Sequence, residues 1–252
     1  MKKCEKCGEP LEYEITVLGA RQKISCICSS RKKELQEREE REAKAERERN
    51  RMICFNGSSL KNCTFENSDD SRYMQIARNY ADHFRDLAKM SKELLPYGNV
   101  GTGKSHLAAC IANKLIDQGY KVLMTNFATI INQLQASFDG RKEYIDSLNR
   151  YALLILDDLG AERNTEYMQE QVFNIIDSRY LSGLPMIVTT NLTSSELKKP
   201  DNIGSGRIYD RILERCHPVE VSGVSMRRKK IKDDFMEMER MLKCGWWENE
   251  TL

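Results

Sequence analysis

The feature that most constrains this chain is a glycine-rich stretch, Gly98-Asn-Val-Gly-Thr-Gly-Lys-Ser105, between an apolar run and a regular helical pattern. It fits the spacing G-x-x-x-x-G-K-[ST] in the strand–loop–helix context that this motif requires. Glycines let backbone N–H groups turn inward, and the helix that follows adds the positive end of its dipole. The stretch therefore predicts a loop that wraps phosphate groups.

The loop also assigns roles to single residues. We expect Lys104 to reach the β- and γ-phosphates of a nucleotide and the Ser105 hydroxyl to ligate Mg²⁺. Pro96 lies just ahead of the loop and has no N–H for a sheet ladder, so we expect it to be the last residue of its strand. The residues expected to contact the nucleotide here are Gly98, Asn99, Val100, Gly101, Thr102, Gly103, Lys104, Ser105 and His106.

Short apolar runs alternate with helical patterns from about residue 54 onwards. The runs are 94–97, 121–126, 152–157, 185–190 and the shorter 218–221. Alternation of this kind predicts an α/β fold with crossover units on a parallel sheet. A chain of 252 residues has room for one such domain and a small appendage. Ahead of the first run, helical spacing of apolar residues predicts one amphipathic helix over 71–91.

The run "LLILDDLGAE" ends in a pair of carboxylates. An acid at the C-terminal end of a parallel strand points toward the ligand crevice of an α/β sheet. We therefore expect Asp157 to hold Mg²⁺ and Asp158 to polarise the attacking water, with Glu162 as the alternative base. An acid pair at this place is also suited to capping the next helix.

Three further polar residues are candidates for the same chemistry. Asn191 follows the run "MIVTT", where its amide can orient a water against the γ-phosphate or form an Asx turn. Arg211 and Arg215 stand at i,i+4 and share one helical face. Surface arginines are often only solvated, so the residues alone leave their role open.

The order of phosphate loop, "LLILDDLGAE", "IVTTN", "RIYDRILER" and "SMRRK" resembles the DnaC/DnaI helicase loaders and the related IstB transposition ATPases of the AAA+ class. The resemblance covers roughly residues 55–240. It implies an αβα sandwich with a five-stranded parallel sheet, ATP as the nucleotide, and a short helical region after the sheet. It also implies that Asn191 is a sensor residue, that Arg211 or Arg215 is a finger reaching a neighbouring subunit, and that Arg227 lies near a second sensor.

The first thirty residues carry two close cysteine pairs, Cys4-x-x-Cys7 and Cys26-x-Cys28. Four thiolates on two tight turns can close on one tetrahedral zinc ion. A segment of this length cannot bury enough core alone, so a metal would stabilise it. Unliganded or redox thiols are the alternative. DnaI-type loaders carry an N-terminal zinc module that engages the helicase, which favours that branch.

A charged segment, 31–51, joins the two parts and is rich in helix formers with Glu and Arg or Lys at i,i+4. It predicts a solvated helical spacer, with a basic nucleic-acid-binding arm as the alternative. We expect a zinc-binding, helicase-interacting module at 1–30, a linker at 31–53, an AAA+ ATPase domain at 54–243 and a tail at 244–252.

The resemblance implies an ATPase that binds a DnaB-type replicative helicase, delivers it to single-stranded DNA, and self-associates on ATP and DNA. The alternatives are an IstB-like transposition helper and a zinc-dependent nucleic-acid-binding protein with a relic nucleotide site. Nine cysteines, no apolar signal core and no run of the ~18 apolar residues needed to span a bilayer predict the cytoplasm. A net charge of +2 gives no global reason for binding nucleic acid.

Overall fold

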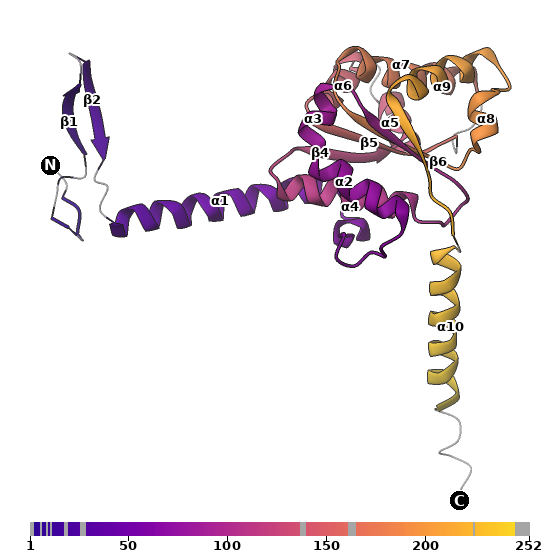
Figure 1. Cartoon of the computed structure of the whole chain (residues 1–252), viewed down its shortest axis with the longest axis horizontal. Helices are drawn as coiled ribbons and strands as arrows, with labels where there is room; N and C mark the ends of the chain where they lie inside the picture. The colour runs from indigo at the N-terminus through magenta and orange to yellow at the C-terminus, as the bar shows by residue number, and fades with distance from the viewer. Residues whose placement is uncertain are drawn as a thin grey trace, which may run out of the picture. The chain divides into compact units, whose positions relative to one another are not determined.

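The computed structural model of the chain describes residues 3–5, 7–8, 10, 12–17, 20–25, 29–136, 140–160, 165–223 and 225–244. The chain divides into two compact units, Met1–Arg49 and Asn50–Leu252, which are described separately (Figure 1). No helix among the described residues is both long and apolar enough to cross a membrane.

The first unit contains an antiparallel hairpin and most of a long helix. Strands β1 (Glu12–Val17) and β2 (Ala20–Ser25) pair along their full length. Helix α1 (Ser29–Phe55) confirms that the charged segment is helical. Ion pairs one turn apart, Lys33–Glu37 and Arg38–Glu42, lie on its exposed surface. Such pairs add a small stabilisation to an isolated helix, which salt screens.

A five-stranded parallel sheet forms the centre of the second unit and confirms the predicted fold. Its order is β4-β5-β6-β3-β7, so the strand that enters the phosphate loop lies between two others. The strands are β3 (Glu93–Tyr97), β4 (Val122–Asn126), β5 (Leu153–Leu159), β6 (Met186–Thr190) and β7 (Cys216–Glu220).

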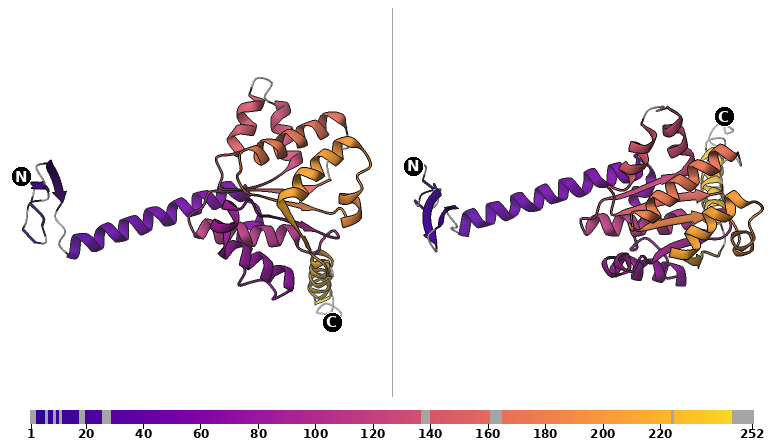
Figure 2. Two further views of the ribbon diagram at one scale, coloured as in Figure 1. Left: turned by 45° about the horizontal axis from the view of Figure 1, so that its top comes forward. Right: turned by 90° about the horizontal axis from the view of Figure 1, so that it is seen from above.

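Helices cover both faces of this sheet (Figure 2). Alternate side chains of β5 show why, because Leu153 and Ile155 join one core whereas Leu154 and Leu156 join the other. The helical elements are η1 (Ser59–Asn62), α2 (Arg72–Asp82), α3 (Phe84–Lys89), α4 (Lys104–Asp117), α5 (Phe127–Ala136), α6 (Arg141–Leu148), α7 (Glu166–Leu181), α8 (Ser194–Lys198), α9 (Ile203–Arg215) and α10 (Met226–Cys244). Helices α2 and α4 contribute to the first core, and α5, α7 and α9 to the second.

The prediction of one helix over 71–91 was wrong, because the chain breaks at His83. This residue has φ −105° and ψ 16°, and its backbone N–H donates to Asn79 O at 3.0 Å to end α2. The break lets Phe84 start α3 in a buried position, edge-on to Tyr120 with ring centroids 5.0 Å apart. Aromatic packing of this kind outweighs the continuation of a regular helix.

Pro96 is not the last residue of its strand, which continues to Tyr97. Toward β7 the ladder includes Pro96 opposite Val219. Toward β6 the paired positions of β3 are Leu94 and Tyr97, and Pro96 is passed over. A proline is therefore tolerated inside a central strand at the cost of a gap in one ladder.

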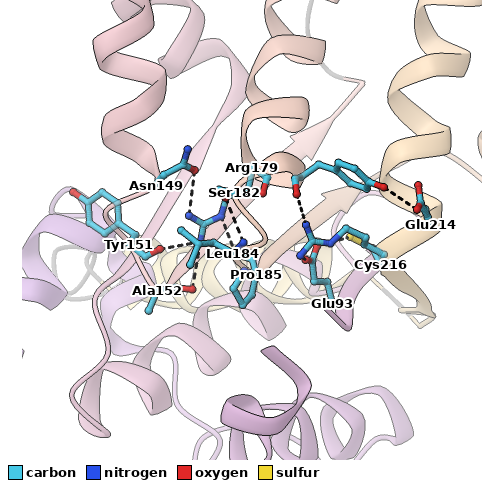
Figure 3. Close-up of polar contacts among 12 residues, drawn as sticks. Glu93, Asn149, Tyr151, Ala152, Arg179, Ser182, Leu184, Pro185, Glu214 and Cys216 are labelled. Carbon is cyan, nitrogen blue, oxygen red and sulfur yellow. Dashed lines mark hydrogen bonds and ion pairs between the residues drawn. The ribbon is translucent and has the colours of Figure 1, made fainter. Parts of the chain in front are cut away.

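Arg179 fastens one side of the sheet from α7 (Figure 3). Its guanidinium, 1% exposed, donates to the carbonyls of Leu148 (3.4 Å), Tyr151 (2.8 Å), Ala152 (3.3 Å) and Pro185 (2.7 Å). These carbonyls belong to the chain entering β5 and the chain entering β6. One side chain thus joins these two chain segments through hydrogen bonds that add to those of the backbone.

Replacing Arg179 by Met is expected to destabilise the second unit by at least ~3 kcal/mol, since several buried carbonyls would lose their donor. Urea unfolding monitored by circular dichroism measures the change. The matched control is Arg85→Met on the exposed face of α3, which should alter the free energy of unfolding by less than ~0.5 kcal/mol. Equal effects of the two substitutions would contradict the role given to Arg179.

Candidate nucleotide-binding site

The glycine-rich loop lies between β3 and α4 and contains three glycines with positive φ: Gly98 (139°), Gly101 (84°) and Gly103 (106°). Two of them also leave no room for a side chain. A Cβ on Gly98 would lie 2.5 Å from Val221 O, and one on Gly101 would lie 2.3 Å from Ser225 Oγ. Glycine is therefore required both by the backbone conformation and by the chain after β7, which packs on the loop.

Lys104, in the first turn of α4, lies inside the loop. Its Nζ donates to Gly98 O and Asn99 O, each at 2.8 Å, and the residue is 6% exposed. Thr102 Oγ1 also donates to Asn99 O, at 2.9 Å. The ammonium group is thus held in the concavity that a chain of phosphates would enter, as the motif predicts.

Ser105 and Asp157 meet across the interval between α4 and β5. The Ser105 hydroxyl lies 2.9 Å from both carboxylate oxygens of Asp157, and Thr189 Oγ1 donates to one of them at 2.6 Å. All of these donor atoms are oxygens, which Mg²⁺ prefers, so the residues fit the predicted magnesium site. Thr189 was not predicted from the sequence, although it stands two residues before Asn191 and so shares its strand face.

Asp158 adopts a left-handed conformation with φ 65°, uncommon for a residue other than glycine. The β5–β6 ladder shifts register between Leu156 and Leu159, so Asp158 lies in an irregular part of the strand. Its N–H donates to Thr189 Oγ1 at 2.9 Å, and Asn191 Nδ2 donates to its Oδ1 at 2.5 Å. Backbone strain of this kind occurs at functional sites, where neighbouring contacts impose it. Glu162, the alternative base, lies outside the described residues.

These elements enclose a pocket of about 430 Å³ at the carboxyl edge of the sheet. Open α/β sheets bind ligands at this edge. The structure therefore brings together the residues predicted from separate motifs and adds the start of η1. The pocket is lined by Ser59, Leu60, Val100, Gly101, Gly103, Lys104, Ser105, His106, Asp157, Asp158, Thr189 and Asn191.

His106 has a second contact besides the pocket. Its Nε2 lies 2.9 Å from Ser68 Oγ, which itself donates to Thr64 O at 2.7 Å. Burial lowers the pKa of His106 below its usual value, so the ring is neutral at neutral pH. A neutral imidazole next to the loop ties the segment around Ser68 to α4.

The arginines of α9 lie elsewhere, and none lines this pocket among the described residues. Arg211 is 37% exposed, with its guanidinium carbon 4.4 Å from the Tyr180 ring centre and its Nε 3.3 Å from Asp177. Arg215 is only 8% exposed and forms a buried ion pair with Glu93, so its side chain is not available to a neighbouring subunit. Arg207, one turn before Arg211, is exposed and was not considered from the sequence.

The remaining predicted site residues are Arg227 and the four N-terminal cysteines. Arg227 lies in the first turn of α10, which starts beside the phosphate loop after Ser225. Cys4 is buried and Cys7 exposed, and Gly8 N donates to Cys4 O at 2.8 Å in a tight turn. Cys26 and Cys28 lie outside the described residues. Within the described part of the chain no group of three or more His, Cys, Asp or Glu side chains could hold a metal ion, so zinc remains a prediction.

A parallel five-stranded sheet with a phosphate loop, an acidic strand end and an asparagine on the adjacent strand defines a P-loop domain of the AAA+ class. Comparison with known families gives the more particular assignment. The family described as IstB-like ATP binding protein matches residues 19–233, and the chain belongs to this family.

Individual relatives include replicative helicase loaders. The replicative helicase loader DnaC of Escherichia coli (strain K12) is 29% identical over 190 residues, which cover 70% of this chain and 72% of that protein. The replicative helicase loader DnaI of Bacillus subtilis (strain 168) is 26% identical over 186 residues, which cover 67% of this chain and 59% of that protein.

Solved structures agree on the fold. The crystal structure of the DnaC helicase loader superposes with a TM-score of 0.57 at 22% identity, covering 66% of this chain and 100% of that one. DnaA from Aquifex aeolicus with bound AMPPCP gives a TM-score of 0.55 at 24% identity, covering 70% of this chain and 55% of that one. At these identities the structural likeness concerns the fold.

Two substitutions separate nucleotide binding from turnover. Lys104→Ala is expected to abolish tight ATP binding, since it removes the charge held in the loop, whereas Asp158→Asn should bind ATP within about threefold of the unmodified chain and hydrolyse it at least about a hundredfold more slowly. A fluorescent-ATP titration and phosphate release measure the two effects. Unchanged ATP affinity in Lys104→Ala would contradict the assignment of the loop.

Proposed function

We propose that this protein is an ATP-driven loader that binds a DnaB-type replicative helicase and delivers it to single-stranded DNA. The observation that carries the proposal is the alignment with two proteins named replicative helicase loader, DnaC and DnaI, over 190 and 186 residues. The matched length is close to that of a whole ATPase domain. The pocket contains the lysine, hydroxyl, acids and amide that ATP hydrolysis requires.

In the proposed reaction each residue of the pocket has one task. Lys104 binds the β- and γ-phosphates, and loop N–H groups bind their oxygens. Ser105 and Asp157 would hold Mg²⁺, which when bound neutralises charge that develops on the transferred phosphoryl group. Asp158 accepts the proton of the attacking water, and Asn191, already bonded to Asp158, orients that water.

The site is proposed to be completed by a neighbouring copy of the chain. Arg211 is the better finger of the two predicted candidates, because its side chain reaches the surface whereas that of Arg215 is buried. A cation brought to the γ-phosphate in trans is worth about 10³–10⁵ in rate. Turnover would therefore depend on self-association on ATP and DNA, which links hydrolysis to assembly on the helicase.

The first unit is proposed to contact the helicase. It consists of a tight turn at Cys4–Gly8, a β-hairpin and the start of a charged helix, which together offer little apolar core. A zinc ion on Cys4, Cys7, Cys26 and Cys28 would supply the missing stabilisation. A small unit stabilised by its own metal would be a suitable docking module, because its folding would depend on zinc and not on the ATPase domain.

The full chain is expected to retain a replicative helicase of the same host in a pull-down, with or without ATP. A chain that lacks residues 1–49 should lose that retention yet bind ATP as before, since its loop and pocket lie in the second unit. If the full chain instead ignores the helicase and binds duplex DNA and a transposase, the IstB-like transposition function replaces the loader.

Metal analysis should find about one zinc ion per chain, because four thiolates bind a structural zinc tightly enough to fold a small module. Cys4→Ser should abolish the zinc content and the hairpin signals in an NMR spectrum. Cys63→Ser, in the second unit, is the matched control and should keep the zinc. Full-length protein that is free of zinc yet has intact hairpin signals would refute the site.

A further inference from the structure

A buried carboxylate lies at the start of β3, at the opposite end of this strand from the phosphate loop. Glu93 is 1% exposed, and its Oε1 lies 2.5 Å from Nη2 of Arg215, the last residue of α9 (Figure 3). The thiol of Cys216 donates to the other oxygen at 3.4 Å. This ion pair lies outside the nucleotide pocket, and the proposed reaction makes no use of it.

A buried ion pair of this kind is weak evidence of a contribution to stability. Burying two charges carries a desolvation cost, and apolar residues of similar volume often serve a fold equally well. Burial raises the pKa of Glu93 to about 7, although the Arg215 charge opposes the rise. A costly ion pair in the core therefore points to a geometric task.

The contacts of Arg215 with α7 indicate this geometric task. Its Nη1 donates to Tyr180 O at 2.9 Å, at the end of α7. The Tyr180 ring lies beneath Arg211, with 4.4 Å from the guanidinium carbon to the ring centre, and its hydroxyl donates to Glu214 at 2.8 Å. Glu93, through Arg215, thus clamps the last turn of α9 onto the aromatic surface where Arg211 rests.

Two paired strands connect this clamp to the phosphate loop. β3 runs from Glu93 to Tyr97 and enters the loop at Gly98. β7 starts at Cys216, directly after Arg215, and pairs with β3 from Glu93↔Cys216 to Tyr97↔Glu220. Just past its end, Val221 packs on Gly98. Both strands therefore have the finger helix at one end and the nucleotide loop at the other.

We propose that Glu93 is a positioning residue for hydrolysis in the neighbouring subunit, because its ion pair with Arg215 sets the place of the Arg211 finger. The inference rests on the proposed function, in which Arg211 acts in trans. Glu93 touches neither nucleotide nor water and acts through Arg215, Tyr180 and α9.

The test mixes variants of the full chain in the presence of ATP and single-stranded DNA. Glu93→Gln should bind ATP within about twofold of the unmodified chain, while its own turnover falls at least about tenfold, since a misplacement of ~1 Å can cost ~10² in rate. Mixed with Lys104→Ala, which retains an intact finger, Glu93→Gln should recover turnover to the extent that Arg211→Ala does. The double variant Glu93→Gln with Arg211→Ala should be no slower than Arg211→Ala alone.

Controls separate positioning from general damage. Arg179→Lys alters a buried arginine of the same region that binds carbonyls and not α9, so it should lower the melting temperature but leave turnover of the folded protein within about twofold. Should Glu93→Gln fail to fold, Arg215→Lys, which keeps the charge but shortens the clamp, is expected to show the same rescue by Lys104→Ala.

The pH profile gives a further readout. Glu93 is faced by Arg215 from α9, Cys216 from β7, Arg179 from α7 and Tyr80 from α2. Burial raises the pKa of the Cys216 thiol and of the Tyr80 hydroxyl, so these two remain protonated near neutrality. Turnover that depends on the clamp should rise with pH through about 7, as Glu93 ionises, and Glu93→Gln should lose this rise.

Three results would overturn the inference: turnover of Glu93→Gln within twofold of the unmodified chain, a loss that Lys104→Ala does not restore, or a pH rise that Glu93→Gln retains. The proposed function fails separately, when Arg211→Ala and Lys104→Ala do not rescue each other in the same mixture.

Discussion

The carboxylate of Asp157 is the point at which the nucleotide site is held together. It accepts hydrogen bonds from Ser105 at the start of α4 and from Thr189 on β6, and it belongs to β5. Thr189 in turn accepts from the N–H of Asp158, whose carboxylate is bonded by Asn191. The loop helix and two strands are therefore fixed to one another through oxygen atoms that can also bind Mg²⁺.

Local chemistry explains which parts could be predicted from the sequence. The glycine spacing, the apolar runs and the acidic strand end each have a short-range physical cause, so the sheet and the pocket followed from them. The break at His83 depends on where Phe84 packs, and tertiary packing is not encoded in a helical repeat. The strand β3 continues past Pro96 because the missing N–H of this proline leaves a gap only in the ladder toward β6. The order of the strands, which shows this, is not encoded in the sequence of β3 itself.

The two arginines predicted as finger residues are a clearer case in which the sequence was not sufficient. Arg211 and Arg215 share a helical face and a residue type, so the sequence offers no means of separating them. The structure separates them by their surroundings, since Arg215 meets the buried carboxylate of Glu93 on β3 whereas Arg211 rests on the half-buried ring of Tyr180. The role of Glu93 was not predicted from the sequence either, because an acid at the edge of an apolar run indicates only where a strand begins or ends.

Buried charge in this domain has two different uses. Arg179 donates to carbonyls of the two chain segments that enter β5 and β6, so it stabilises the fold. The ionised carboxylate of Glu93, in contrast, lowers the free energy of unfolding. Its pKa is raised from 4.5 to about 7, so the folded state holds its proton more tightly than the unfolded chain does. The contribution of this group to stability is present below about pH 4.5 and is lost as the pH rises through 7.

An acid whose ionisation weakens the fold, yet which pairs with Arg215 of α9 in that state, is better understood through geometry than through stability. β3 and β7 are hydrogen-bonded along five residue pairs, so a shift at one end of this ladder cannot be absorbed within it by bending a loop. Val221 and Ser225 lie against Gly98 and Gly101, where phosphates would bind, and Cys216 follows Arg215 directly. A change in the loop on nucleotide binding would therefore have a rigid route to α9, the helix that is proposed to serve the next subunit. Coupling between the loop and α9 requires an element with two positions, and both sites must favour one position over the other. Under the proposal the Glu93–Arg215 pair is such an element, because it joins the start of β3 to the last residue of α9.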